Sequence, residues 1–250
     1  MRVWLLDHGS IAIEHSQMMW NVPGPQARVP VYSVLVEHDE GLFLFDTGMD
    51  LDHMSSELPL RLAEQTQEQT LPAQLSYCGF CLNDVTAVVN SHLHVDHVGG
   101  NQLFKGTGVR HVIHERELAQ ARNHEAFERA GYSDRSWDYE GANIEAFKGD
   151  RELARGIRLL ETPGHTVGHC SVLLRGATGE RCLLFAMDVA YTAEAMVKGI
   201  QPGFHNNPRD GVRSIARVKA IAAEYRARVL YSHDMDAWRG YAHAPRHYEL

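Results

Sequence analysis

Four runs of apolar and β-branched residues in this chain are each followed by histidine or aspartate, and this arrangement constrains the fold more than any other feature. The largest group, His92-Leu93-His94-Val95-Asp96-His97, follows the predicted strand Val85–Val89. The other three groups also follow strand-like runs, and they are Thr162-Pro163-Gly164-His165, Met187-Asp188 and Ser232-His233-Asp234. Binding and catalytic residues tend to collect on the loops that leave strands. The chain is therefore expected to contain sheets that carry a site at their strand ends.

The side chains in these four groups have the chemistry of metal ligands. Imidazole nitrogens and carboxylate oxygens suit divalent ions such as zinc. The largest group places four possible ligands within six residues, more than one tetrahedral site can use while it leaves room for a substrate. We therefore expect two divalent metal ions, with zinc favoured, although iron, manganese and cobalt also occupy such sites. The alternative is a histidine-rich surface loop formed by chance, and the three later groups argue against it.

The rest of the pattern predicts one α/β domain over residues 1–250. Strands outnumber helices in the first part of the chain, and helices are interspersed rather than strictly alternating with strands. This favours two sheets packed face to face with helices outside, not a doubly wound parallel sheet. Gly99 and Gly100 are expected to let the chain turn sharply after the histidines. Further strands are predicted at Val3–Leu6, Val31–Glu37, Leu42–Phe45, Val109–Ile113, Ile157–Glu161, Ser171–Leu174, Cys182–Met187 and Arg228–Tyr231. Helices are predicted at Pro72–Phe80, His114–Asn123 and Asp210–Tyr225, while Arg61–Thr70 permits a helix and 131–156 is expected to be mostly loop.

Composition excludes several classes of partner. The net charge of −8 argues against nucleic acid or an anionic membrane as the main partner. No apolar run is long enough for a transmembrane helix, and an acid occurs too early for a signal peptide. No paired cysteine framework suggests export, so a reducing cytoplasm is expected. The pair Cys78 and Cys81 could form a redox or zinc CxxC motif. The simpler interpretation, two buried thiols at the end of a helix, is preferred because no second CxxC completes a zinc site.

These motifs, taken in order, resemble those of the metallo-β-lactamase superfamily. The HxHxDH, TPGH and later Asp and His motifs span the chain from Asp46-Thr47-Gly48 to His233. The resemblance implies a four-layer αββα sandwich with the site along one edge of the sheets. It also implies that Asp188 bridges the two metals and that Asp46 orients the ligand loop without binding metal. The implied ligands are His92, His94 and His165 for one metal, and Asp96, His97 and His233 for the other.

Within the superfamily the chain is most similar to the lactonases. The common zinc β-lactamases have Cys where this chain has Asp188, and too few residues follow His233 for the extra helical region of glyoxalase II. Asp188-Val189-Ala190-Tyr191 and Thr162–His169 are similar to motifs of the N-acyl homoserine lactonases. Other segments are similar to the 4-pyridoxolactonases, notably Pro30–Ser33, Asp46–Gly48 with Asp50, Gly131–Asp134 and Tyr231–Asp236.

The resemblance implies a reaction in which a metal-bridging hydroxide opens the ester bond of a small lactone. Tyr191 would donate a hydrogen bond to the carbonyl oxygen or to the leaving alkoxide. Asp96 would accept or relay a proton as the ring opens. His169 is interpreted as structural rather than as a ligand. The alternatives are a thioester hydrolase of the glyoxalase II type, a β-lactam hydrolase, and a non-catalytic metal- or redox-sensing module.

Substrate specificity is only weakly indicated by the sequence. The apolar segment around Met19 and Trp20 is expected either to cap the substrate pocket or to cover a sheet edge. Phe204 and His205, in a loop bounded by glycine and proline, are a second candidate wall of that pocket. If the segment around Met19 and Trp20 is exposed, it could also support a homodimer.

Overall fold

The computed structural model describes all residues of the chain, 1–250. Its internal contacts divide the chain into two compact units. Unit 1 comprises Met1–Ile11, Pro30–Phe147 and Ala242–Glu249. Unit 2 comprises Ala12–Val29, Lys148–Tyr241 and Leu250. The prediction of a single domain therefore stays a prediction, and each unit is described by itself.

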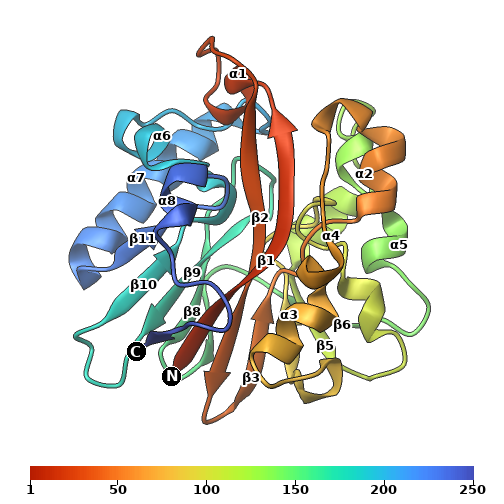
Figure 1. Cartoon of the computed structure of the whole chain (residues 1–250). Helices are drawn as coiled ribbons and strands as arrows, with labels where there is room; N and C mark the ends of the chain where they lie inside the picture. The colour runs from red at the N-terminus through yellow and green to blue at the C-terminus, as the bar shows by residue number, and fades with distance from the viewer. The chain divides into compact units, whose positions relative to one another are not determined.

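Unit 1 is built on a seven-stranded sheet with the strand order β12-β1-β2-β3-β4-β5-β6 (Figure 1). Strands β3 to β6 are neighbours and run parallel to one another. The carboxyl ends of parallel strands lie at the same edge of a sheet, so the residues after β3 and after β4 meet there. The strands are β1 (Arg2–Ile13), β2 (Ala27–His38), β3 (Gly41–Phe45), β4 (Ala87–Val89), β5 (Arg110–His114), β6 (Asn143–Phe147) and β12 (Tyr248–Glu249).

The helices of unit 1 cover the sheet through two clusters of buried apolar residues. Helix α3 (Leu71–Tyr77) buries Leu71 and Leu75 against residues of β1 to β4. Helix α4 (Glu115–Arg122) packs Leu118 in a second cluster, which contains Trp137 of α5 (Asp134–Trp137). The remaining helical elements are α2 (Leu51–Glu57) and the 3-10 turns η1 (Pro59–Arg61), η2 (Gln67–Gln69), η3 (Leu82–Asp84), η4 (Asn101–Phe104) and η5 (Arg129–Gly131).

Unit 2 is built on a five-stranded sheet with the order β11-β10-β9-β8-β7. Strands β8, β10 and β11 point the same way, because β9 is antiparallel to both β8 and β10 while β11 is parallel to β10. The residues that follow these three strands therefore lie at one edge of the sheet. The strands are β7 (Arg151–Ala154), β8 (Ile157–Glu161), β9 (Cys170–Arg175), β10 (Cys182–Phe185) and β11 (Arg228–Leu230).

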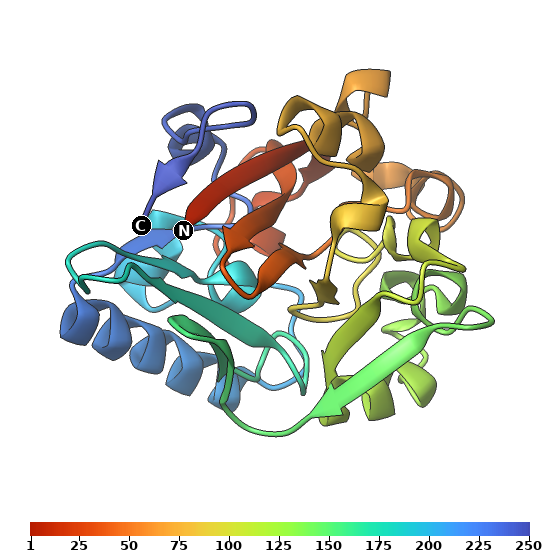
Figure 2. The ribbon, with the colours of Figure 1, turned by 90° about the horizontal axis from the view of Figure 1, so that it is seen from below.

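One long helix covers a face of the five-stranded sheet. Helix α7 (Pro208–Tyr225) lies along the strands (Figure 2) and buries Ile215 and Val218 among the side chains of β8 to β10. Proline at its first position and the Asn207 cap, which accepts hydrogen bonds from two backbone N–H groups, explain why it begins there. The other helical elements are α1 (His15–Met18), η6 (Met187–Val189), α6 (Ala193–Lys198) and α8 (Met235–Arg239).

The predicted fold class is confirmed, since both sheets carry helices, but one local prediction was wrong. The segment 61–70, which permits a helix, instead forms 3-10 turns and an isolated β-bridge at Glu64. The segment 131–156, expected to be mostly loop, contains α5, β6 and β7. Strand β6 forms because its backbone pairs in parallel with β5 over five residue pairs, a long-range contact that no local periodicity encodes. No helix is both long and apolar enough to span a lipid bilayer.

Candidate metal centre

The four candidate ligands of unit 1 form a compact cluster directly after β4. The ring centroids of His92 and His94 are 4.6 Å apart, and those of His92 and His97 are 4.2 Å apart. Asp96 Oδ2 lies 3.8 Å from His97 Nε2. The three imidazoles are buried and Asp96 is partly exposed. The loop thus gathers three rings and one carboxylate at the carboxyl edge of the sheet.

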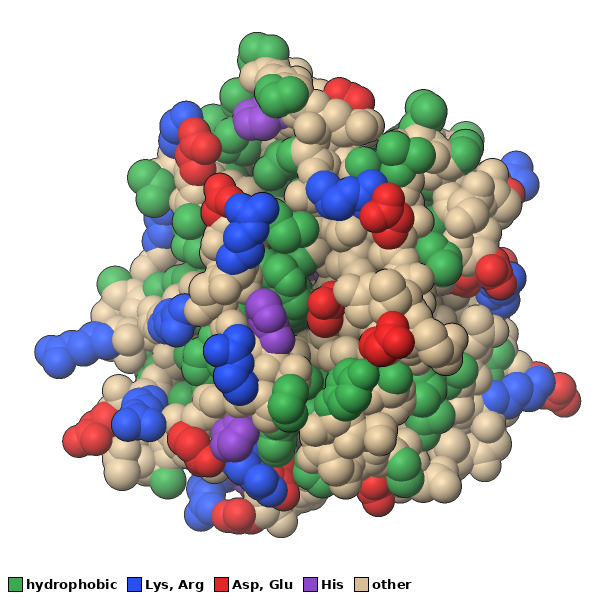
Figure 3. Space-filling view, viewed as in Figure 1, with side chains coloured by type: hydrophobic (Ala, Val, Ile, Leu, Met, Phe, Trp, Pro, Cys, Tyr) green, Lys and Arg blue, Asp and Glu red, His purple; other side chains and the backbone are tan.

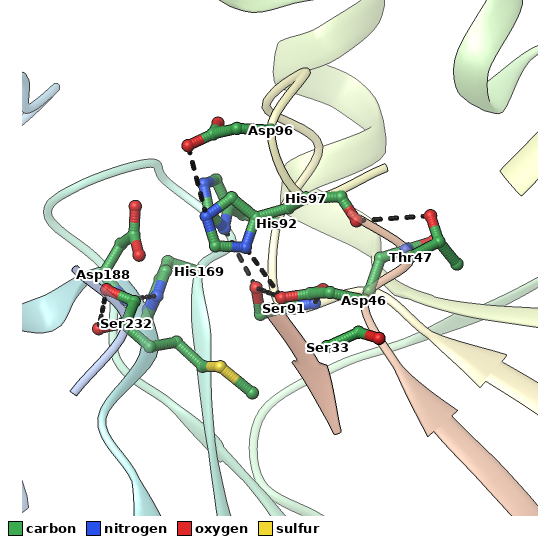
Figure 4. A network of polar contacts seen from close by, with 12 residues as sticks. Ser33, Asp46, Thr47, Ser91, His92, Asp96, His97, His169, Asp188 and Ser232 are labelled. Atoms are coloured by element: carbon green, nitrogen blue, oxygen red, sulfur yellow. Dashed lines mark hydrogen bonds and ion pairs between the residues drawn. The ribbon is translucent and has the colours of Figure 1, made fainter. Parts of the chain in front are cut away.

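Asp46, directly and through Ser91, determines which nitrogen carries the proton in the rings of His97 and His92. Its carboxylate, 1% exposed, accepts hydrogen bonds from the Ser91 N–H at 2.8 Å, the Ser91 hydroxyl at 2.7 Å and His97 Nδ1 at 2.8 Å (Figure 4). Because the Ser91 hydroxyl donates to Asp46, its oxygen accepts from His92 Nδ1 at 3.0 Å. Both rings then carry their proton on Nδ1 and direct the Nε2 lone pair outward, the form in which imidazole binds metal.

The backbone of the histidine loop is held by partners from elsewhere in unit 1. The Leu93 N–H, between two candidate ligands, donates to the carboxylate of Glu117 at 2.9 Å, and Glu117 is fully buried. The Val95 N–H donates to the carbonyl of Gly131 at 3.0 Å. Nothing in the sequence around Glu117 distinguished it, because a glutamate in a predicted amphipathic helix usually faces solvent.

Asp50 joins the histidine loop to two further segments of unit 1. Its backbone N–H donates to the Val95 carbonyl at 2.7 Å, and its carboxylate caps α2 by accepting from the His53 N–H. Burial alone would raise the pKa of Asp50, but hydrogen bonds from Arg135, His53 and Ser136 outweigh burial and hold that pKa below its usual value. Asp50 is therefore a charged anchor that fixes the loop to α2 and α5.

The candidate ligands of unit 2 form a second cluster at the ends of β8, β10 and β11. His165 Nε2 lies 3.3 Å from Asp188 Oδ2, and His233 Nε2 lies 3.6 Å from the same oxygen. All three side chains are buried. His165 Nδ1 donates to the Phe204 carbonyl at 2.7 Å, which again leaves Nε2 as the nitrogen with the lone pair.

His169 supports Asp188 rather than adding a ligand. Its Nδ1 donates to the Thr162 carbonyl at 3.0 Å, and its Nε2 accepts from the Asp188 backbone N–H at 2.9 Å. The Ser232 hydroxyl donates to the Met187 carbonyl at 3.1 Å, and Figure 4 shows Ser232 and His169 close to Asp188. This agrees with the interpretation of His169 as a structural residue.

The geometry of the second cluster fits a metal ion. An isolated buried carboxylate is unfavourable unless a positive charge compensates it, and Asp188 is 1% exposed between two imidazoles. Two ligand atoms that each lie about 2.1 Å from one tetrahedral zinc ion are about 3.4 Å apart. The separations of 3.3 and 3.6 Å are close to that value. The donor atoms are also of the types that divalent metals prefer.

The other candidate residues of unit 2 differ in how deeply they are buried and in what they contact. The Tyr191 ring is buried, with its centroid 4.6 Å from that of His233 and 5.9 Å from that of His165. Met19 is 2% exposed in the apolar core beneath α7, whereas Trp20 is 43% exposed and lines a cavity. The ring of His205 contacts that of Trp20, and Phe204 reaches His165 through its carbonyl.

The remaining histidines and cysteines take no part in either cluster. His111 hydrogen-bonds to the Tyr139 hydroxyl at 2.6 Å, and burial lowers its pKa to about 4. His114 caps α4 by accepting from the Arg116 N–H. Cys78 is half-buried and Cys81 is exposed, so the expectation of two buried thiols was wrong. Burial raises the pKa of the Cys78 thiol to about 12, and a thiol protonated at neutral pH is a poor nucleophile.

Comparison with known proteins agrees with this geometry. A sequence profile of the metallo-beta-lactamase superfamily matches residues 27–233 of the chain. An N-acyl homoserine lactonase of Bacillus sp. is 28% identical over 249 residues, which cover 96% of this chain and 95% of that protein. A second N-acyl homoserine lactonase, from Rhizobium radiobacter, is 28% identical and covers 99% of this chain and 98% of its own length.

A solved structure extends the likeness to the whole fold. It is an N-acyl homoserine lactone hydrolase with the product N-hexanoyl-L-homoserine bound at its catalytic metal centre. It superposes with a TM-score of 0.87 and 25% identity, and the match covers 99% of this chain and 98% of that chain. A dizinc quorum-quenching lactonase superposes with a TM-score of 0.74 at 18% identity, which bears on the fold alone.

Proposed function

The chain belongs to the metallo-β-lactamase superfamily, and we propose that it is a metal-dependent lactonase that opens the ester ring of N-acyl homoserine lactones. The observation that carries the proposal is its likeness, over nearly the whole chain, to proteins named for that activity. The buried imidazole and carboxylate clusters of both units support it, because they supply the donor types that such a hydrolase requires.

We further propose that the two clusters act together on two divalent ions, with zinc favoured. His92, His94 and His165 would hold one ion, Asp96, His97 and His233 the other, and Asp188 would contact both. When bound, such ions polarise a carbonyl oxygen and lower the pKa of water from 15.7 to about 7. Asp46 and the Phe204 carbonyl support this assignment, because they keep the Nδ1 protons of His97 and His165 away from the metal side.

The residues of the chain itself have separate tasks in ring opening. The Tyr191 hydroxyl would donate a hydrogen bond to the oxygen on which negative charge develops, and its ring packs edge-on near those of both His165 and His233. Asp96, whose side chain is 17% exposed, is the candidate ligand best placed to exchange a proton with water. The lactone's carbonyl carbon gains an oxygen from water, the ring C–O bond breaks, and the alkoxide takes up a proton to give the hydroxy acid.

The proposed class of lactone substrate is the one named for the similar proteins. The matched proteins are N-acyl homoserine lactonases, so the proposal is for that class. The similarity of short segments to 4-pyridoxolactonases gains no support from these comparisons, and 4-pyridoxolactone is kept only as a comparison substrate in the test.

The test is a panel of substrates with metal analysis on the same sample. Proton release is measured after addition of an N-acyl homoserine lactone, 4-pyridoxolactone, a glutathione thioester and a cephalosporin. We expect turnover of the acyl homoserine lactone and about two metal ions per chain. Turnover of the thioester or the cephalosporin alone would overturn the lactonase proposal. The Asp188→Asn variant is expected to lose metal and activity together, and unchanged metal content would contradict its bridging role.

A further inference from the structure

A cavity in unit 2 lies outside the two ligand clusters and contains none of their residues. Its volume is about 560 Å³, within the range of small-molecule sites. It is formed by Trp20, by the segment that follows α6, and by the first two turns of α7. The side chains that give it chemical character are Trp20, Ile200, Gln201, Arg209, Val212 and Arg213.

One part of the cavity is positively charged. Arg209 and Arg213 stand four positions apart on α7, so both line the same face of that helix. Arg213 pairs with Asp210 at 3.2 Å, whereas the structure gives the Arg209 guanidinium no ion pair. Like charges at this spacing repel each other and destabilise a helix. The pair therefore leaves a local positive excess, although the net charge of the chain is −8.

The other part of the cavity is apolar and open to solvent. Trp20 is 43% exposed and Val212 is 53% exposed, and both belong to the few large apolar side chains of the chain that water reaches. Ile200 adds to this wall. Trp20 is also held in place. Its backbone N–H donates to the Gln201 carbonyl at 2.9 Å, and its ring packs edge-on against that of His205, with the centroids 4.6 Å apart.

From these two walls we propose that the cavity binds a small amphiphilic carboxylate, with the carboxylate on Arg209 and Arg213 and an aliphatic body against Trp20, Ile200 and Val212. Arginine pairs with carboxylates through two parallel hydrogen bonds, and the hydrophobic effect favours covering the apolar wall. A bare inorganic anion would leave that wall exposed, and a cation would meet the arginines. A medium-chain fatty acid and a ring-opened N-acyl amino acid share the required chemistry.

Trp20 provides a direct signal for this binding, because the other three tryptophans are at most 7% exposed. The intact protein is titrated with octanoate while tryptophan fluorescence is recorded. We expect a saturable change that is lost in Trp20→Phe. Octanol and octyltrimethylammonium, which have the same chain without the negative charge, are expected to produce no saturable change at matched concentrations. N-hexanoyl-homoserine, titrated in parallel, distinguishes a fatty acid from an opened acyl lactone as the preferred carboxylate.

Charge-neutral variants test the two arginines. Arg209→Gln and Arg213→Gln are each expected to raise the dissociation constant for octanoate by about tenfold or more. Arg239→Gln, which removes an exposed arginine of α8 outside the cavity, is the control and is expected to bind like the parent. Calorimetric titration of the parent with octanoate and octanol checks the result without a substitution. Equal binding of octanol, unchanged affinity in both cavity variants, or no saturable binding of any carboxylate would overturn the proposal.

Discussion

At the scale of single residues, buried carboxylates position the histidine loop from two sides. Asp46 accepts from Ser91 and His97, and Glu117 accepts from the Leu93 N–H. Both carboxylates are almost completely shielded from water. A backbone N–H left without an acceptor in such a site costs about 1–3 kcal/mol. These two side chains therefore set the direction of the histidines without belonging to the candidate ligand set.

Substitution of Glu117 separates its hydrogen bond from its charge. Glu117→Ala leaves the Leu93 N–H without its acceptor, so we expect unfolding free energy to fall by about 1–3 kcal/mol and metal to be lost to a competing chelator more readily. Glu117→Gln keeps an oxygen that can accept and is expected to retain most of both properties. Urea unfolding and chelator competition measure the two effects. Equal behaviour of the Ala variant and the parent would show that the bond has no positioning role.

Tyr191 is expected to act on the reaction rather than on the metal. Tyr191→Phe removes only the hydroxyl, so ring packing against His233 is kept. We expect kcat with an acyl homoserine lactone to fall by about a hundredfold, the usual effect of losing one donor to a developing oxyanion. Metal content should match that of the parent. A fully active variant would make Tyr191 a structural residue. A variant depleted of metal would show that the Tyr191 hydroxyl helps to retain the metal rather than to promote turnover.

At the scale of elements, the histidine loop and the turn after β3 are packed backbone against backbone in unit 1. Gly99 was expected to serve a sharp turn, but it does not have the positive φ that favours glycine. A Cβ built on Gly99 would lie 1.9 Å from the Met49 carbonyl carbon and 2.0 Å from the Asp50 nitrogen. Glycine is needed here because two backbones touch, and the Asp50 and Val95 backbones are hydrogen-bonded alongside.

This contact gives a prediction with a matched control. Gly99→Ala must push the two backbones apart, so we expect a loss of about 3 kcal/mol or more of unfolding free energy. Gly240→Ala, also at a negative φ but with its nearest neighbour at 3.5 Å, is expected to stay within about 0.5 kcal/mol of the parent. Thermal and urea unfolding of both variants provide the comparison. Similar stability of the two would mean that the loop shifts without cost.

Local sequence predicted some elements well and others not at all. Strand β8 was predicted with its observed bounds, and α7 differs by two residues at its start, because apolar patterning marks both elements. The prediction missed the start signal of α7, which is Pro208 after the Asn207 cap. Helices α2 and α6 escaped notice because they are short, and most of their residues are polar or weakly patterned. Strand β6 depends on pairing with β5. Elements that exist through one distant partner leave little periodicity to detect.

At the scale of the whole molecule, charged side chains mix with apolar ones on the face seen in one view, while selected titratable groups are buried. The face in Figure 3 shows acidic and basic side chains interspersed with hydrophobic ones. His8, by contrast, is 1% exposed, and burial lowers its pKa from 6.5 to about 4. Its neutral ring lies 3.0 Å from the Gln69 carbonyl and 2.7 Å from the Ser33 hydroxyl. Folding therefore favours the uncharged form of this histidine.

His8 is expected to make stability depend on pH. Because the folded pKa of about 4 lies below the unfolded value of 6.5, the unfolded chain binds more protons between these values. Stability from His8 is complete above pH 6.5 and is lost as the pH falls towards 4. We expect a decrease of about 2 kcal/mol between about pH 7 and pH 5 from this group.

Urea unfolding over that pH range, with chelator present throughout, measures the dependence. The difference between the parent and His8→Gln isolates His8 from the other histidines, and the variant should show a shallower pH slope. Ser33→Ala retains the imidazole and is expected to keep the parent slope despite lower stability. Identical slopes for the parent and His8→Gln would contradict the role given to His8.

The sequence by itself determined the chemistry of the site, the family and most of the strands. The donor atoms of residues such as His92 and Asp188 are given by residue type alone, and the order of these residues along the chain does not depend on the fold. Only the tertiary structure decided which atoms do the positioning. Glu117, the close approach at Gly99, the tautomers set by Asp46 and the arginine-lined cavity beside Trp20 all depend on distances between segments that are remote in sequence. Such distances arise from packing and strand pairing, and a linear pattern of residue types does not encode them.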